Sequence, residues 1–417
     1  MSTTPDQTKT AIDAITFTDP QVQLCPFSAY RSVMEQRRLH RDAVSGWWEV
    51  LGHDDLMKIV QDPARYSSEH MLYGERTYLA AYEETSRMFR EEGYPTVPAL
   101  INADEPAHRR NRDIVEPSLR AARVRMLEPY IRELVNQLID DWGEADEIEF
   151  MDRFAVMLPV YVIADTIGVS RNRAADLKRW SDAMMKAGDS QNTAEENISL
   201  TRQIIEFQQF VAAEYEKARV DPGENILGDT ARATIDDGPV PTRLAVHIIS
   251  GLLVAGNETT TATLGAAMKR MIDEPGMEAR LRAEPERIPD FIEEVLRLES
   301  PLQCTFRTNR EAATFGDEEL PKDALVVLRF GAGNRDPKRF ADPDKLDIDR
   351  PRIRQHLAFG GGIHMCIGHL LARAELKIAY EELLKRLCNF RLAGEPTALP
   401  GFIAYGPRTM PIGFERI

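Results

Sequence analysis

The feature that most constrains this 417-residue chain is one very long predicted helix. Apolar side chains recur from Leu244 to Leu253 without a charged residue, and Pro241 and Pro275 bound the stretch Thr242–Glu274. At 1.5 Å per residue this helix would span roughly 50 Å, enough to cross a whole domain. We therefore expect the rest of the chain to be arranged around one buried helix.

The middle of this helix is poorly suited to helix formation. It reads Gly256-Asn257-Glu258-Thr259-Thr260-Thr261. Glycine costs about 1 kcal/mol relative to alanine, and β-branched threonines lose rotamer freedom against the preceding turn. An acidic side chain in apolar surroundings is also costly unless it is paired or solvated. Several local rules failing together in a buried element indicate a functional site, with Glu258 and Thr259 as candidates.

A second stretch, Phe359–Gly368, combines three consecutive glycines with Cys366, just before another predicted helix. Glycines permit backbone conformations closed to other residues and a close approach to a neighbouring group. A cysteine at a helix N-terminus lies where amide N–H groups and the helix dipole favour the thiolate, the form that binds metals. The plainer alternative is a buried structural cysteine after a tight turn. The loop therefore predicts a metal ligand.

Both stretches resemble signature motifs of the cytochrome P-450 monooxygenases. Phe-Gly-x-Gly-x-His-x-Cys-x-Gly is similar to their haem loop, and Ala255–Thr260 is similar to their Ala-Gly-x-Asp/Glu-Thr-Thr/Ser pattern. The resemblance implies that Cys366 binds the iron of haem b (iron protoporphyrin IX) and that Glu258 and Thr259 deliver protons during oxygen activation. It also implies the fold class: mainly α with small β-sheets, in one large domain that holds the haem between the long central helix and the helix after the cysteine loop.

Four further residues are candidates for holding the haem propionates. His108 and Arg112 are four residues apart and share one helix face, and arginine offers a planar fork for a carboxylate. On spacing alone, a solvated basic face explains them equally well. The stretch Asp104–Arg112 is similar to the family motif Asp-x-Pro-x-His-x-x-x-Arg, which implies that this pair binds a propionate. By the same resemblance, Arg307 and His364 are two more propionate ligands.

Glu294 and Arg297 are three residues apart on another predicted helix. Such a pair is usually solvated and contributes about 0.2–0.5 kcal/mol. The resemblance implies instead a buried structural pair that ties this helix to the segment before the haem loop. The third member in the family is an arginine, and the chain departs from that pattern. Two residues are open for the role: Lys345, which lacks the bidentate geometry of arginine, and Arg350.

The resemblance places the substrate pocket between the central helix, an extended segment after Pro301 and a C-terminal turn. The candidate lining residues are mostly apolar or weakly polar: Leu100, Val254, Ala255, Leu302, Gln303, Cys304 and Tyr405. The irregular region between Tyr66 and Asp104, with a predicted helix over Thr77–Glu92, would cap this pocket. Such a lining predicts a hydrophobic substrate, for example a terpenoid, a steroid, a fatty acid or an aromatic compound.

Composition restricts partners and location. The net charge of −15 argues against a nucleic-acid partner. The polar N-terminus lacks the apolar core of a signal peptide, and no uncharged apolar run reaches the roughly 18–20 residues of a membrane span. The four cysteines show no clustered metal or redox spacing, which fits a reducing cytoplasm. We expect a cytoplasmic protein with a loosely ordered tail over residues 1–20 and a catalytic domain over residues 21–417.

The predicted function is that of a haem-thiolate monooxygenase, which inserts one oxygen atom of O2 into a small hydrophobic molecule by hydroxylation or oxidative dealkylation. No Gly-x-Gly-x-x-Gly fingerprint for a flavin or nicotinamide is evident, so electrons would come from a separate ferredoxin or flavodoxin with its NAD(P)H reductase. Arg109 and Arg110 are interpreted as surface charges, with an acidic electron donor as the partner that they would face. Two alternatives stay open: a peroxide-driven or isomerising haem-thiolate enzyme, against which the Glu258–Thr259 pair argues, and a non-catalytic haem protein that senses gas or carries electrons.

Overall fold

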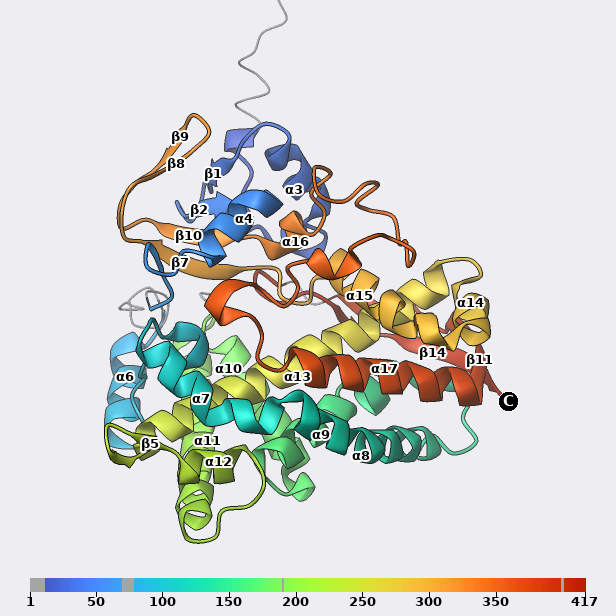
Figure 1. The fold of residues 1–417 in the computed structure, drawn as a ribbon, viewed down its shortest axis with the longest axis horizontal. Helices are drawn as coiled ribbons and strands as arrows, with labels where there is room; N and C mark the ends of the chain where they lie inside the picture. Colours follow the sequence, from blue (N-terminus) through green and yellow to red (C-terminus); the bar gives the residue numbers. More distant parts are fainter. Residues whose placement is uncertain (1–11, 70–78, 190, 399–400) are drawn as a thin grey trace, which may run out of the picture.

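The computed structural model describes residues 12–69, 79–189, 191–398 and 401–417. Figure 1 shows a large helical part crossed by the central helix and, at one end, a smaller part that contains the largest sheet. The helices are α2 (Pro20–Leu24), α3 (Phe27–Met34), α4 (His53–Val60), α6 (Tyr82–Glu91), α7 (Ala107–Leu119), α8 (Ala121–Asp140), α9 (Met157–Ile167), α10 (Ala174–Lys186), α11 (Ala194–Val220), α12 (Ile226–Arg232), α13 (Thr242–Asp273), α14 (Met277–Ala283), α15 (Ile288–Glu299), α16 (Phe330–Gly333) and α17 (His369–Arg386). Among the described segments, no helix is both long and apolar enough to cross a bilayer.

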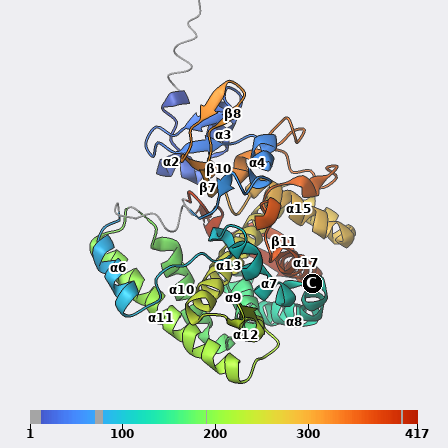
Figure 2. The ribbon, with the colours of Figure 1, turned by 60° about the vertical axis from the view of Figure 1, so that its left-hand side comes forward.

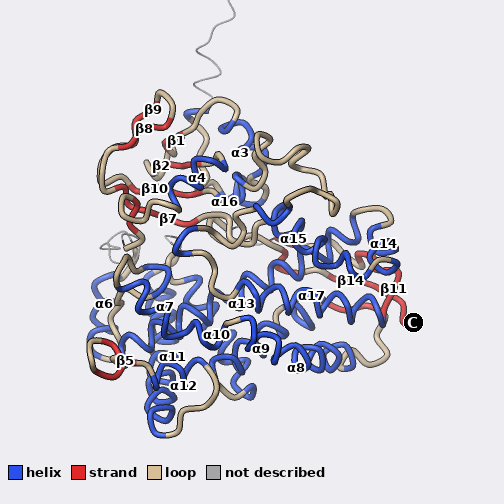
Figure 3. The backbone as a smooth tube through the Cα atoms, in the orientation of Figure 1, coloured by secondary structure: helices blue, strands red, loops and turns tan. Residues whose placement is uncertain are grey.

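The strands form small sheets, as Figure 3 makes clear by colour. The largest sheet has the order β1-β2-β10-β7-β3, with β2 and β10 parallel and the other pairs antiparallel. Its strands are β1 (Leu39–Arg41), β2 (Trp48–Val50), β10 (Leu325–Leu328), β7 (Thr305–Asn309) and β3 (Tyr66–Ser67). The other sheets are formed by β11 (Leu387–Leu392), β14 (Pro411–Arg416) and β4 (Glu147–Glu149), and by the pairs β5 (Thr234–Ile235) with β6 (Gly238–Pro239), β8 (Ala313–Phe315) with β9 (Glu318–Leu320), and β12 (Thr397–Ala398) with β13 (Pro407–Thr409). The predicted fold class, mainly α with small sheets, is confirmed.

Helix α13 is the predicted central helix, and it begins at Thr242 after the boundary proline as expected. Its N-terminal half, including Val246 and Leu253, packs into a core shared with α9, α10, α11 and α12. Its C-terminal half, including Leu264 and Met271, packs into a second core shared with α8, α15 and α17. Between the two cores lies the Gly256–Thr261 stretch. The helix therefore joins two cores, and the unusual residues lie where they part.

Helix α17 runs beside α13 in both ribbon views (Figures 1 and 2). The Tyr380 hydroxyl on α17 donates a 2.6 Å hydrogen bond to the Leu264 carbonyl oxygen on α13. Because α17 begins only three residues after Cys366, this packing fixes the cysteine loop relative to the central helix. This packing places the cysteine loop next to the central helix, and the site between the two helices stays a prediction.

The N-terminal region differs from its prediction. Residues 1–11 of the expected tail lie outside the described residues, but Ile12 and Phe17 are buried among α3 and its neighbours. The Asp42 carboxylate accepts a 2.7 Å hydrogen bond from the Phe17 amide. Residues 12–20 are therefore part of the packed fold, because buried apolar side chains and a buried carboxylate hold them.

The predicted helix over Thr77–Glu92 is observed as α6, Tyr82–Glu91, and its first residues fall outside the described part of the chain. Figure 2 shows α6 beside α11, far along the chain. The Asn197 side-chain amide donates a 2.9 Å hydrogen bond to the Ala80 carbonyl oxygen just before α6. The segment expected to cap the pocket is thus fixed to α11. We call the helices α9 to α12, which share one core, the helical roof.

Candidate active site

Two glycines with left-handed backbone conformations shape the cysteine loop. Gly360 and Gly362 have φ of +66° and +63°, which other residues rarely adopt. A Cβ at Gly362 would lie 1.9 Å from the Val60 carbonyl oxygen at the end of α4. The Cys366 amide donates a 2.8 Å hydrogen bond to the Phe359 carbonyl oxygen and so closes the loop. The glycines therefore serve to pack the loop against α4, a neighbour that the sequence did not identify.

The structure corrects one expectation about Cys366. Burial raises the pKa of its thiol above the usual range, although the Gly368 N–H and the charges of Arg112 and Arg373 oppose this effect. Position before a helix does not by itself favour the thiolate here, because loss of hydration outweighs these groups. A bound cation would supply the missing stabilisation of the thiolate.

The four predicted propionate ligands come together from three separate segments. His108 and Arg112 lie on α7, Arg307 on β7 and His364 in the turn before Cys366. The rings of His108 and His364 have centroids 4.2 Å apart. Arg112 also donates a 2.9 Å hydrogen bond from Nη1 to the Met365 carbonyl oxygen, so it fastens the cysteine loop as well.

This cluster has donors for a dianionic group. The Glu105 carboxylate touches it at His108 Nδ1, 3.3 Å away, and Arg307 and His364 have no anionic partner among the described residues. Arg307 is 5% exposed, and its guanidinium donates only to the Phe306 carbonyl oxygen among the described residues. Burial lowers the pKa of Arg307 to about 10. Burial, and next the charge of Arg307, lower the pKa of His364 to about 3, and its buried Nδ1 has no partner in the described structure. The buried Arg307 cation and a buried His364 ring nitrogen without a partner fit carboxylates such as haem propionates.

An open face of α13 lies between the two cores. Gly251 and Ala255 are exposed although they belong to the middle of a buried helix, and Val254, Glu258 and Thr259 are half-buried on the same side. The Thr259 hydroxyl donates a 2.8 Å hydrogen bond to the Ala255 carbonyl oxygen. The predicted site residues Val254, Ala255, Glu258 and Thr259 are therefore adjacent, and they border open space.

Glu258 is held by neighbours that the sequence did not reveal. Its Oε1 accepts hydrogen bonds from the Ser181 hydroxyl at 3.2 Å and the Asn257 amide at 3.1 Å, and it lies 3.8 Å from Lys178 Nζ. Burial raises the pKa of Glu258, while Lys178 opposes that rise. Ser181 and Lys178 lie on α10, so only the tertiary structure could identify them. Asn257 alone carried a signal, because a polar residue in a buried helix requires a partner.

Three of the predicted pocket residues have side chains that are bonded to or packed against other parts of the protein. Gln303 is 1% exposed; it accepts from the Tyr30 hydroxyl at 3.1 Å and donates to the Glu299 carbonyl oxygen at 2.8 Å. The buried Cys304 thiol donates to the Phe402 carbonyl oxygen at 3.3 Å. The Tyr405 ring lies edge-on to Phe27, with centroids 5.4 Å apart. We therefore leave Gln303, Cys304 and Tyr405 out of the proposed lining.

Leu100 and Leu302 remain candidates for the lining. Leu100 begins a short turn before Asp104 and packs partly against the core of the helical roof. Leu302 is half-buried and forms an isolated β-bridge with Ala404 of the C-terminal turn. The turn of Leu100 contacts α13, whereas Leu302 packs against the core of the largest sheet.

The open question about the third member of the Glu294–Arg297 network is settled by geometry. Arg297 binds both carboxylate oxygens of Glu294, each at 2.7 Å, and both side chains are fully buried. Arg350 Nε donates to Glu294 Oε1 at 3.0 Å. Lys345 contributes its carbonyl oxygen, which accepts from Arg297 and Arg350. The side chain of Arg350 completes the network, and that of Lys345 does not enter it.

Arg109 and Arg110 are paired within the chain. Arg109 lies 2.9 Å from Asp113 on α7, and Arg110 lies 2.8 Å from Asp236 in the β5–β6 turn. Their charges are thus partly neutralised, which weakens the case for them as docking residues.

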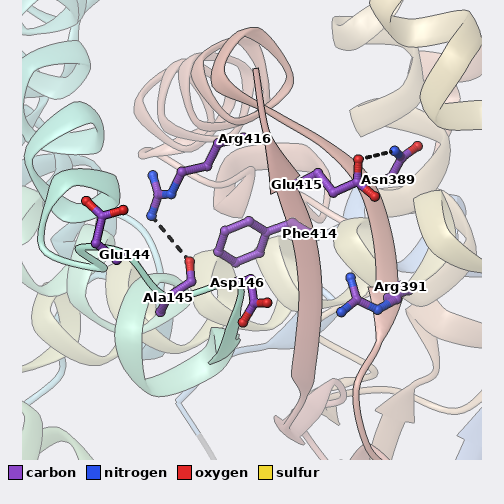
Figure 4. Close-up of a pocket in the computed structure, with 8 residues that line it drawn as sticks. All are labelled: Glu144, Ala145, Asp146, Asn389, Arg391, Phe414, Glu415 and Arg416. Carbon is purple, nitrogen blue, oxygen red and sulfur yellow. Dashed lines mark hydrogen bonds between the residues drawn. The ribbon is translucent and has the colours of Figure 1, made fainter.

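Two surface depressions lie away from Cys366. The larger, of about 590 Å³, is bordered by β11, β14 and the turn before β4, with polar side chains such as Glu144, Asn389 and Arg416 (Figure 4). It contains none of the predicted site residues. The smaller, of about 370 Å³, lies between α10 and α11 and is bordered by Lys178 and Asp182. Lys178, which faces Glu258, therefore also borders this surface groove.

Known proteins share both the sequence and the fold. The family Cytochrome P450 matches residues 233–396. Cytochrome P450 107B1 of Saccharopolyspora erythraea is 33% identical over 84% of this chain and 84% of its own. The cyclomarin C epoxidase CymV of Salinispora arenicola is 31% identical over 92% of this chain and 95% of its own. The solved structure of cytochrome P450 CYP109Q5 from Chondromyces apiculatus is similar with a TM-score of 0.84 and 31% identity, over 97% of this chain and 99% of that one.

With a closed cysteine loop, a gathered set of propionate donors and relatives of this similarity, the chain belongs to the cytochrome P450 family. It is a monooxygenase whose cofactor is haem b. The alternative of a non-catalytic haem sensor or electron carrier is not supported.

Proposed function

We propose that this monooxygenase oxidises a small hydrophobic organic molecule, by hydroxylation or oxidative dealkylation, in the cytoplasm. The open face of α13 carries the proposal, because small and apolar positions at Gly251, Val254 and Ala255 lead directly to Glu258 and Thr259. A relative named as an epoxidase supports oxygen insertion into an organic substrate. Electrons would come from a separate ferredoxin or flavodoxin and its NAD(P)H reductase.

The residues of the site would divide the work. Cys366 would bind the iron, and His108, Arg112, Arg307 and His364 would hold the propionates. Bound haem b supplies the oxygen chemistry, in which thiolate donation favours O–O cleavage.

Glu258 and Thr259 would transfer protons through their side-chain oxygen atoms. Glu258 Oε1 receives protons from the side of the α10–α11 groove, where Lys178 and Asp182 reach solvent. The Thr259 hydroxyl borders the open face and can hold a water molecule there. These two residues would pass protons inward while the apolar face excludes other water.

The carbon monoxide difference spectrum of the dithionite-reduced protein tests the haem assignment. We expect a strongly red-shifted Soret band that is absent in Cys366→Ala. An unshifted, histidine-like band in folded protein would contradict thiolate ligation by Cys366.

Thr259→Ala tests the proton role. We expect less product per NADH consumed, because water held by the hydroxyl is lost and reduced oxygen escapes. The neighbouring Thr260→Ala is the matched control, since Thr260 is 3% exposed and lies in the core. Equal coupling in the wild type and Thr259→Ala would remove this role.

A further inference from the structure

The open face of α13 continues beyond Ala255 toward the start of the helix. Gly251 lies two turns before Thr259, and no described atom lies within 4 Å of the place that a Cβ would take there. On the other side of the helix, Leu252 and Leu253 are buried in the core. Open space therefore extends along one side of the central helix, away from the proposed site of oxidation.

His247 lies one turn further along the same side. Positions 247, 251, 255 and 259 recur every four residues, so they share one helix face. The Nδ1 of His247 lies 2.8 Å from the Arg243 carbonyl oxygen, to which only a protonated nitrogen can donate. Nδ1 therefore carries the proton of the neutral ring, and Nε2 is an acceptor. The ring is half-buried, and no described residue pairs with Nε2.

His247 is the polar group at the far end of an otherwise apolar face. Gly251, Val254 and Ala255 have no side-chain donor or acceptor, and the Ser250 hydroxyl already donates to the Val246 carbonyl oxygen at 2.7 Å. Twelve residues separate His247 from Thr259, which is about 18 Å along a helix. An extended chain advances roughly 1.2 Å per bond, so this distance corresponds to about 15 bonds.

We infer that His247 determines substrate specificity: its Nε2 accepts a hydrogen bond from a hydroxyl at the remote end of an elongated apolar substrate. The other end of that substrate lies beside Thr259, where oxidation takes place. This inference rests on the proposed function and adds the length and the terminal group of the substrate.

The surroundings of His247 favour a hydroxyl over a carboxylate. Burial lowers the pKa of His247, so the ring is neutral and accepts at Nε2 near pH 7. The Arg243 guanidinium, one turn away, is occupied by the carbonyl oxygens of Pro95 at 2.6 Å and Thr96 at 2.9 Å. Because Nε2 of His247 is a neutral acceptor and the Arg243 guanidinium is already bonded, this end of the site favours a hydroxyl over a carboxylate.

Two matched probes test the inference with haem-loaded protein: tetradecan-1-ol and its methyl ether, which cannot donate a hydrogen bond. Their dissociation constants follow from the spin-state shift of the Soret band. A neutral hydrogen bond contributes about 0.5–1.5 kcal/mol, so we expect the alcohol to bind about 2- to 12-fold more tightly than the ether. This preference should disappear in His247→Phe and persist in Ser250→Ala, whose hydroxyl is bonded to the backbone.

Gly251→Phe independently tests the length of the open space beside α13. The new side chain enters space that no described atom fills, so the helix itself tolerates it. We expect both 14-carbon probes to bind at least tenfold more weakly, while octane, which ends before position 251, keeps its affinity.

Each remaining outcome overturns the inference. Equal affinities for alcohol and ether in the wild type, or a preference that survives in His247→Phe, would exclude the contact. A Soret shift in the opposite direction would place the hydroxyl at the iron and reverse the proposed orientation. A normal carbon monoxide spectrum with these results would leave the proposed function intact, whereas an unshifted carbon monoxide spectrum would reject both together.

Discussion

Glu258 illustrates how single residues are tuned in this protein. Its carboxyl group accepts hydrogen bonds from Ser181 and Asn257, which are both buried, and faces Lys178 at 3.8 Å. Burial raises its pKa, so the protonated form persists to a higher pH than for an ordinary glutamate. A protonated carboxyl group can donate a proton when one is required.

Replacing Lys178 by methionine should therefore change the pH profile. Loss of the positive charge removes an effect that lowers the pKa of Glu258, so the pKa rises further. If protonated Glu258 supplies protons, product formed per NADH falls as pH rises through that pKa, and in Lys178→Met this fall should move to higher pH. Lys186→Met is the control, because Lys186 borders the same groove. Identical profiles in the wild type and Lys178→Met would count against the role of Glu258.

A second buried acid, Glu293, should govern acid stability. Burial alone would raise its pKa, but hydrogen bonds from His356 and Arg373 outweigh burial and hold the pKa at about 2, below the ordinary 4.5. The stabilisation is complete above pH 4.5 and is lost as pH falls toward 2. We expect Glu293→Gln to cost roughly 3 kcal/mol at pH 6, and the difference from wild type to shrink below pH 4.5. Urea unfolding at several pH values measures this; a constant difference from pH 6 to pH 3 would contradict it.

At the scale of elements, the sequence predicted helices and motifs, which depend on local signals, better than it predicted contacts between residues far apart in sequence. The helix predicted over Thr242–Glu274 is observed over Thr242–Asp273, because apolar periodicity and the bounding prolines act within a few residues. The motif around Cys366 located the haem loop for the same reason. The orientation of Gln303 did not follow, because it depends on Tyr30, far away in sequence. The partner of Glu294 was likewise undecidable between two nearby cations until the fold placed Arg350.

The Glu294 network therefore yields a matched pair of variants on the segment before the haem loop. Arg350→Lys keeps the charge but loses the fork that reaches Glu294 and the carbonyl oxygens of Asp342 and Lys345. Because Glu294 is fully buried, we expect a cost of roughly 3 kcal/mol and a lower haem content. Lys345→Met should change neither, since only its backbone takes part. Equal melting temperatures for the two variants would show that the network does not need Arg350.

At the scale of the molecule, α13 connects two cores, and residues 92–100, part of the predicted pocket cover, are bonded to it through Arg243. Gln208 on α11 holds this segment: its side chain accepts from the Tyr94 amide at 2.8 Å and donates to the Tyr94 carbonyl oxygen at 3.1 Å. Gly93 makes this approach possible, because a Cβ there would lie 2.6 Å from the Gln208 oxygen. Gln208 is thus a buried attachment of this cover, beside the exposed bonds from Arg243 and Gln209.

Gln208→Leu should release this cover without unfolding the protein. Leucine keeps much of the volume but removes both hydrogen bonds, each contributing about 1 kcal/mol, so local opening at Tyr94 should become roughly 30-fold more frequent. Hydrogen exchange of the peptide covering residues 92–100 measures this opening, while peptides from α13 should exchange as in the wild type. Gln209→Ala is the control, because its single bond to the Glu92 carbonyl oxygen is exposed. Unchanged exchange at residues 92–100 would mean that other contacts hold the cover; faster exchange throughout α13 would mean that Gln208 supports the whole roof.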